Sequence, residues 1–191
     1  LETEGYSGTT ISKIVERGEV SRGAHVYHFP SKSALIEAAA KHLVKRVYIQ
    51  LGKAFMNLPD SEDRLQAMAI SGWRTVFCAR EHAVLLELLL ASRHDEELAA
   101  VMQRLWTSGY AVIRAAAVHY FEPVDPKDNV ESIIALLQWL LRGMVLDRHL
   151  VKDPTLLEEH VVLWCDLMRT RIRARPGVNT PPPRPPEWVF Q

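Results

Sequence analysis

Apolar side chains recur with a helical period along most of the chain. Ile11, Ile14 and Val15 fall at positions i, i+3 and i+4. Residues 133–144 repeat Ile, Leu and Met at spacings that form one broad apolar face. No convincing run of alternating β-branched residues lies between turn signals, so strands are not expected. The pattern therefore predicts an all-α protein.

Capping residues and prolines place the ends of the predicted helices. Ser31 can cap a long helix that Pro59 ends. Asp95 can cap a later helix, whose first turn then carries two further acids. Asp125-Pro126 and Asp153-Pro154 predict two more starts, because each pairs an acidic cap with proline at the first helical position.

These boundaries predict three parts. A small head comprises residues 1–50, and a body of about five helices comprises residues 51–175. The tail, residues 176–191, contains six of the eleven prolines. It is expected to be extended or poorly ordered.

Residues 9–32 carry the pattern of a helix-turn-helix. A short amphipathic helix is predicted over Thr10–Arg17, with a turn at Gly18-Glu19 and an apolar anchor at Val20. Ser21 can cap a second short helix that runs to about His28. Such a unit lays its second helix in the major groove, with its first residues facing the base edges. Double-stranded DNA is therefore the predicted partner of this segment.

The same segment resembles the TetR (tetracycline-repressor) family of DNA-binding domains. The spaced positions that agree are Gly5, Tyr6, Thr9, Thr10, Ile11, Ile14, Val20, Ser21, Gly23, His28, Phe29, Ser31, Lys32 and Leu35. The resemblance implies a three-helix head joined to a helical ligand-binding and dimerisation bundle. The family's first helix is largely missing here, since only residues 1–4 precede Gly5. The chain also has Glu19 where the family usually has glycine, and Val26 where it usually has an aromatic residue.

Carried over by position, the resemblance implies which residues meet DNA. Thr10 and Lys32 would contact phosphate, while Arg22, Ala24 and His25 would face bases. The complete implied set is Thr10, Ser21, Arg22, Gly23, Ala24, His25, Tyr27, His28 and Lys32. The implied function is sequence-specific transcriptional regulation: a repressor that a small apolar or amphipathic effector releases from operator DNA.

Charge agrees with a head that approaches DNA. The formal net charge is zero, but residues 1–53 hold eight Lys and Arg against five acids, which leaves 15 against 18 in the remainder. A basic head on an acidic body suits contact with phosphate, although chance asymmetry is the alternative. The two cysteines form no ligand pattern, and no signal peptide or membrane span is visible. The chain is expected to be cytoplasmic and to have no contact with a membrane.

Aromatic side chains are frequent in the body, where most should belong to the core. A subset could line a ligand pocket between helices: Trp73, Phe77, Leu86, Leu89, Trp106, Tyr110 and Trp139. Arg74, Arg114 and Arg142 lie in apolar stretches and could pair with an acidic ligand, although surface arginine is the alternative for each.

The last two long helices are expected to form a homodimer interface. The candidate residues are Leu136, Leu140, Gly143, Met144, Val161, Trp164 and Leu167, for which the protomer's own core is the alternative.

No catalytic residues, metal site or cofactor are predicted. No histidine pair has HxxxH spacing, and no phosphate loop or nucleophile motif is present. His25 and His28 have a possible metal-ligand spacing, which DNA binding explains better. Two other function classes stay open: a helical dimeric module that binds a ligand or protein without specific DNA binding, and an enzyme.

Overall fold

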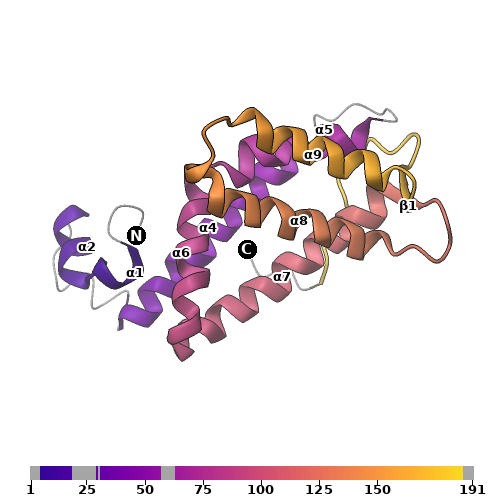
Figure 1. Ribbon diagram of the computed structural model, residues 1–191. Coiled ribbons are helices and arrows are strands. Elements are labelled where there is room, and N and C mark those ends of the chain that lie inside the picture. Colours follow the sequence, from indigo (N-terminus) through magenta and orange to yellow (C-terminus); the bar gives the residue numbers. More distant parts are fainter. Residues whose placement is uncertain (1–4, 19–28, 30, 57–62, 187–191) are drawn as a thin grey trace.

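The computed structural model describes residues 5–18, 29, 31–56 and 63–186. Its elements are almost all helical, and the long helix α4 joins the head to the body (Figure 1). In chain order they are α1 (Gly5–Gly8), α2 (Ile11–Arg17), α4 (Lys32–Met56), α5 (Arg64–Gly72), the π-helical turn η1 (Trp73–Phe77), α6 (Arg80–Ala91), the 3-10 turn η2 (Ser92–His94), α7 (Glu96–Tyr120), β1 (Phe121–Pro123), α8 (Val130–Asp147), the 3-10 turn η3 (Arg148–Leu150), α9 (Thr155–Met168) and β2 (Ile172–Ala174). The predicted all-α class and body of about five helices are confirmed.

Side-chain caps explain where several helices begin. The Ser31 hydroxyl accepts the Ala34 N–H at 3.1 Å, and the Asp95 carboxylate accepts the Leu98 N–H at 3.0 Å, as predicted. The predicted start at Asp125-Pro126 is wrong, because α8 begins at Val130. Asn129 caps that helix by accepting the Ser132 N–H at 2.8 Å. Asp125 instead accepts the Lys127 N–H in a turn, at 2.9 Å.

Two short strands correct the expectation that strands are absent. β1 and β2 pair antiparallel, with Phe121 opposite Ala174 and Pro123 opposite Ile172. Phe121 and Ile172 are buried at 1% and 2% exposure, so the pairing is fixed by core packing. Segments of three residues are too short to show an alternating pattern in the sequence.

The described part of the proline-rich tail, residues 176–186, contains no helix or strand and lies against the body. The Thr180 carbonyl is 2.8 Å from His119 Nε2, and the Arg64 guanidinium donates to Asn179 Oδ1 at 3.3 Å. Val178 packs against the core, and Pro182 lines a cavity of the body. The first half of the tail is therefore part of the body's surface.

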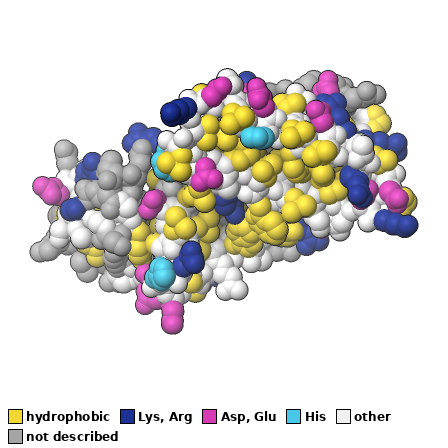
Figure 2. Space-filling view, viewed as in Figure 1, with side chains coloured by type: hydrophobic (Ala, Val, Ile, Leu, Met, Phe, Trp, Pro, Cys, Tyr) yellow, Lys and Arg dark blue, Asp and Glu magenta, His cyan; other side chains and the backbone are white. Residues whose placement is uncertain are grey.

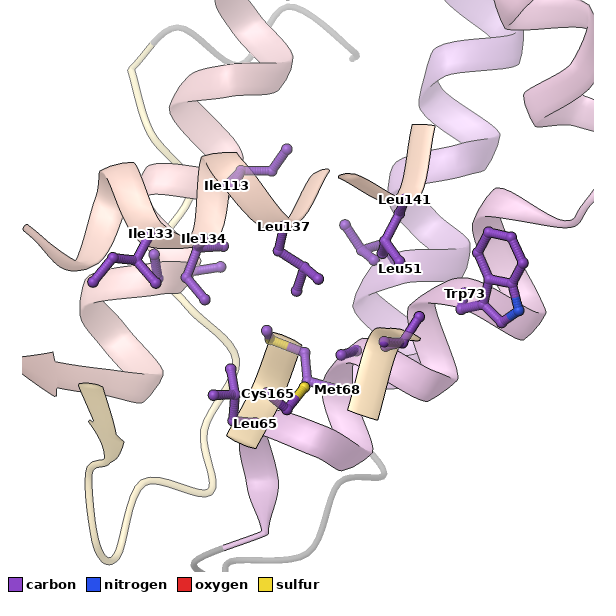
Figure 3. Close-up of a cluster of buried hydrophobic side chains, with 14 of the residues drawn as sticks. Leu51, Leu65, Met68, Trp73, Ile113, Ile133, Ile134, Leu137, Leu141 and Cys165 are labelled. Carbon is purple, nitrogen blue, oxygen red and sulfur yellow. The ribbon is translucent and has the colours of Figure 1, made fainter. Parts of the chain in front are cut away.

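The core consists of two clusters of buried side chains. The larger one gathers residues of α5, α7, α8 and α9 around Met68, Leu137 and Leu141 (Figure 3). The smaller one packs the first half of α4, through Ile36 and Ala40, against α6 and α7. The second half of α4 belongs to the larger cluster, so one helix connects both. The predicted boundary between residues 50 and 51 falls inside this helix.

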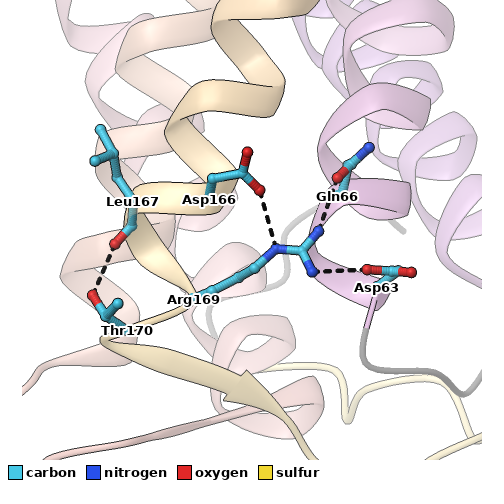
Figure 4. A network of polar contacts seen from close by, with 6 residues as sticks. All are labelled: Asp63, Gln66, Asp166, Leu167, Arg169 and Thr170. Carbon is cyan, nitrogen blue, oxygen red and sulfur yellow. Dashed lines mark hydrogen bonds and ion pairs between the residues drawn. The ribbon is translucent and has the colours of Figure 1, made fainter.

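A polar network fastens the end of α9 to the beginning of α5. The Arg169 guanidinium donates to Asp63 at 2.8 Å and to Gln66 at 2.9 Å, and it pairs with Asp166 at 3.3 Å (Figure 4). The Asp63 carboxylate holds the pKa of Arg169 above its usual value. Because these groups are exposed to solvent, their contribution to stability is small.

Candidate DNA-binding head and internal cavity

The first helix of the predicted helix-turn-helix begins at an exposed threonine. Thr10 has extended backbone angles, and its hydroxyl accepts the Lys13 N–H at 3.4 Å as the N-cap of α2. The first N–H groups of this helix point toward its positive end, where an anion is favoured. The structure thus shows Thr10 as an exposed N-cap, and its contact with phosphate stays a prediction.

The remaining predicted DNA contacts fall mostly outside the described residues. These are Ser21, Arg22, Gly23, Ala24, His25, Tyr27 and His28, and their roles stay predictions. Lys32 is the first residue of α4, directly after the helix-turn-helix segment.

The head contacts the body through a hydrogen bond at the start of α7. The Tyr6 hydroxyl donates to Asp95 Oδ2 at 2.6 Å, while Asp95 Oδ1 caps α7. Burial, followed by the hydrogen bond to this carboxylate, raises the pKa of Tyr6 to about 12. Helix α1 also packs beside α6 (Figure 1). The Asp95 carboxylate thus caps α7 and also accepts a hydrogen bond from Tyr6 of the head.

The body contains a cavity of about 60 Å³ that we call the polar lobe. It lies between α4, α6, α7 and α8, beside the π-helical turn η1. Its polar or aromatic wall residues are Tyr48, Phe77, His82, Trp106, Gln138 and Arg142.

His82 is the most enclosed polar side chain of this lobe. It is 2% exposed, and neither ring nitrogen has a hydrogen-bond partner among the described residues. Its ring lies 4.6 Å from that of Phe77, between centroids. Burial, with a smaller effect of the nearby Arg142 charge, lowers the pKa of His82 to about 4. The imidazole is therefore neutral at physiological pH, with one nitrogen able to donate and the other able to accept.

Arg142 brings a positive charge to the same lobe. Its guanidinium lies 4.8 Å from the centroid of the Trp106 ring, in a cation–π contact. Its Nε is buried and has no hydrogen-bond partner in the part of the chain that the structure describes. Burial lowers the pKa of Arg142, which nevertheless stays charged because a guanidinium does not deprotonate in proteins.

A second cavity, the apolar lobe, adjoins the first and has a volume of about 90 Å³. The two lobes have five wall residues in common: Tyr48, Leu51, Phe77, Ile113 and Gln138. The rest of the apolar lobe is formed by aliphatic side chains, of which Met68 and Leu137 come from the larger core cluster. The tail closes it with Pro182.

Only some of the predicted pocket residues line the two lobes. Phe77, Leu89 and Trp106 line it, whereas Trp73 and Leu86 are buried in the core away from the lining of either lobe. Tyr110 stacks on Trp106 with centroids 6.5 Å apart. Trp139 is 55% exposed on the outer face of α8.

Sequence reasoning missed Tyr48, His82 and Gln138 as wall residues. Each is a polar side chain on a helix face that is otherwise apolar, and this was the available signal. Of the three arginines considered for an acidic ligand, only Arg142 reaches the cavity. Arg74 pairs with Glu158 and Arg114 with Glu131, both on the surface.

Helices α8 and α9 carry an outward apolar face, and Figure 2 shows hydrophobic side chains gathered over these helices. Its exposed members include Leu136 at 50% and Leu167 at 58%. Among the other predicted interface residues, Gly143 is exposed, while Leu140, Met144 and Trp164 are half-buried. Val161 is fully buried in the protomer's own core and is not part of this face.

The described residues lack two kinds of feature. No group of three or more His, Cys, Asp and Glu side chains is placed to hold a metal ion. None of the described helices combines the length and the apolar character that crossing a membrane requires.

Comparison with known proteins agrees with the architecture. Residues 1–39 match the model of the bacterial regulatory proteins of the tetR family. Over 86% of this chain and 84% of the relative, the sequence is 27% identical to an uncharacterised HTH-type transcriptional regulator of Mycobacterium tuberculosis. The HTH-type transcriptional regulator CymR of Pseudomonas putida is 28% identical over 83% of this chain and 78% of its own length.

Two solved structures share the fold. A Pseudomonas aeruginosa PAO1 chain assigned as a transcriptional regulator superposes with a TM-score of 0.69 at 20% identity, covering 88% of this chain and 84% of its own. A Rhodococcus sp. chain assigned as a TetR-family transcriptional regulator gives 0.67 at 17% identity, covering 88% and 92%.

The head and its match therefore define a DNA-binding transcriptional regulator of the helix-turn-helix class. Residues 1–39 of the chain carry the DNA-binding segment of the tetR family of bacterial regulatory proteins.

Proposed function

We propose that the chain is a sequence-specific repressor that acts in the cytoplasm. Residues 1–50 bind double-stranded operator DNA, residues 51–175 bind a small apolar or amphipathic effector and form the dimer, and residues 176–191 are a proline-rich tail. The single observation that carries this proposal is the course of α4. The same helix begins at Lys32, directly after the DNA-binding segment, and places Tyr48 in the cavity wall.

The effector and the operator bind different arrangements of the same dimer in this mechanism. Each ligand then weakens the other's binding by the same factor. α4 is the pivot, and α6 is a second connection because it packs beside α1 and carries His82. A shift of α4 changes the separation of the two recognition helices from the roughly 34–36 Å of successive major grooves. An unchanged separation in effector-free and effector-bound dimers would contradict this mechanism.

The dimer forms through the outward face of α8 and α9. Its exposed apolar members, including Leu136, Trp139 and Leu167, are the kind of surface that a soluble chain covers by association. Pairing about a two-fold axis would present both heads to the two half-sites of an operator.

DNA titration at fixed salt tests the function. The full chain is titrated against the DNA upstream of its own gene and against a shuffled duplex of equal composition. We expect tight binding to the first duplex only, weakened by roughly 1–3 kcal/mol in Arg22→Ala. Arg93→Ala is the matched control, because it removes an exposed arginine from η2, in the body.

Equal, weak and salt-sensitive binding to both duplexes would contradict the proposal. It would favour a helical dimer that binds a ligand or a protein without reading DNA sequence.

A further inference from the structure

We infer that the cavity binds a small organic carboxylate, with Arg142 and His82 on its carboxylate group and the apolar lobe around its hydrocarbon part. The inference deepens the proposed function, on which it rests, by naming the chemical class of the effector.

The charge of Arg142 is the first argument. Two other arginines of the body meet carboxylates at the surface: Arg74 pairs with Glu158, and Arg114 pairs with Glu131. Arg142 lies inside the body, where no carboxylate of the described residues reaches it, and its Nε is unpartnered. A buried cation is unfavourable unless it is paired. The face of Trp106 compensates only in part, so a ligand that supplies a negative charge gains the most here.

The imidazole of His82 is the second argument. A polar side chain that is 98% buried is normally hydrogen-bonded, and both ring nitrogens of this 2% exposed residue lack partners in the described structure. Arg142 is near enough to act on its charge, so both groups face the same space. The neutral ring can donate one N–H to a carboxylate oxygen, while the guanidinium donates two more hydrogen bonds to the same group.

The apolar lobe limits the size and shape of the ligand's hydrocarbon part. The lobes measure about 60 Å³ and about 90 Å³. Together they approach the roughly 150 Å³ of an engineered cavity that binds benzene. Phe77, Tyr48 and Gln138 border both lobes, and the remaining wall of the larger lobe is apolar. A carboxylate joined by a short chain to one ring, or to an aliphatic chain of similar length, has this shape.

Paired probes separate charge from shape. The probes are 3-phenylpropanoate and octanoate, each compared with its own neutral amide, and binding to the full chain is measured by isothermal titration calorimetry. At least one acid is expected to bind about tenfold or more tightly than its amide, because hydrogen bonds to an ionised group are the stronger ones. Arg142→Met should reduce this preference to about twofold or less, and His82→Phe should reduce it by a smaller factor. Arg114→Met, at an exposed arginine, should leave it unchanged.

A folding control keeps the test decisive. Arg142→Met replaces a half-buried charge that has no carboxylate partner among the described residues by an apolar side chain of similar length, so its melting temperature without probe should equal or exceed that of the wild type. Equal affinity for acid and amide, absence of binding by both acids, or an acid preference that survives Arg142→Met would each overturn the inference.

DNA titration of the wild type without any probe provides a separate readout. Specific DNA binding without acid preference refutes the carboxylate inference alone. Acid preference without specific DNA binding refutes the proposed function and leaves the carboxylate site standing.

Discussion

The contact between α4 and α7 at Gly109 makes a sharp stability prediction. A Cβ atom added at Gly109 would lie 1.9 Å from Tyr48 Oη and 2.7 Å from Tyr48 Cζ. Real Cβ atoms do not approach other heavy atoms so closely, so Gly109→Ala must displace the ring. Tyr48 packs against both core clusters, which leaves the ring little room to move. The substitution therefore forces an adjustment of the helix pair that lines the cavity.

The magnitude follows from two opposing effects. Alanine is favoured over glycine inside a helix by about 1 kcal/mol. Overpacking a buried site costs about 1–3 kcal/mol, and a 1.9 Å overlap lies at the upper end of that range. We expect Gly109→Ala to lower the free energy of unfolding by about 1–2 kcal/mol. Gly52→Ala is the matched control, because Gly52 is also helical, lies on α4 and would place its Cβ in open space.

Thermal unfolding followed by circular dichroism, at one protein concentration, provides the assay. A difference of about 2–3 kcal/mol between the two variants corresponds to about 4–12 °C in melting temperature for a chain of this size. Gly52→Ala should melt above the wild type and Gly109→Ala below it. In a Tyr48→Phe background the loss should be smaller, because the closest atom is removed while Cζ remains. Equal upward shifts for both alanine variants would refute the reasoning.

Further predictions concern titration, capping and assembly. His82 has a pKa of about 4 in the folded chain against 6.5 in the unfolded chain, so the free energy of unfolding should fall by up to about 3 kcal/mol as the pH falls from 6.5 to 4. Chemical denaturation at several pH values should show a weaker dependence of this free energy on pH in His82→Phe. Asp95→Ala should destabilise the chain by about 1 kcal/mol through the lost cap of α7, measured by urea unfolding. Tyr6, with its pKa raised from 10.0 to about 12, should contribute stability that is lost as the pH rises through this interval, and Tyr6→Phe should abolish that loss. Leu167→Glu should dissociate the proposed dimer in sedimentation velocity, whereas Val118→Glu, at an exposed apolar residue of α7, should not.

Much of the helical architecture could be predicted because the signals are local. The long helix after Ser31 and the start of α7 at Asp95 each depend on a side chain that caps its own helix. Where two local signals competed, the prediction failed. Asp125-Pro126 is a plausible helix start, but Asn129 is the residue whose amide accepts the first-turn N–H.

The cavity could not be predicted because its walls come from distant parts of the chain. Periodicity indicates which face of a helix is buried, but not which side chains of other helices face it. Trp139 and Trp106 look alike in the sequence, yet one lies on the outer face of α8 and the other covers Arg142. No sequence motif includes His82. Its burial, and the lack of hydrogen-bond partners for its ring in the described structure, are what mark it as part of a site.

The polar groups that destabilise the cavity wall are also those that would make the body respond to a ligand. A half-buried guanidinium whose Nε has no hydrogen-bond partner, and a buried imidazole without one in the described structure, make the body less stable than apolar side chains there would. A carboxylate that pairs with them stabilises the arrangement in which both reach it, by an amount set by its concentration relative to its Kd. The proposed effector control requires that α4 and α6 differ between this arrangement and the one that fits DNA, because a ligand shifts an equilibrium only through differential affinity. Both helices border the polar lobe with Tyr48 and His82, and α6 also packs beside α1 of the head. A body in which every buried polar group already had a partner would gain less free energy from binding a ligand. Its conformational equilibrium would therefore shift less.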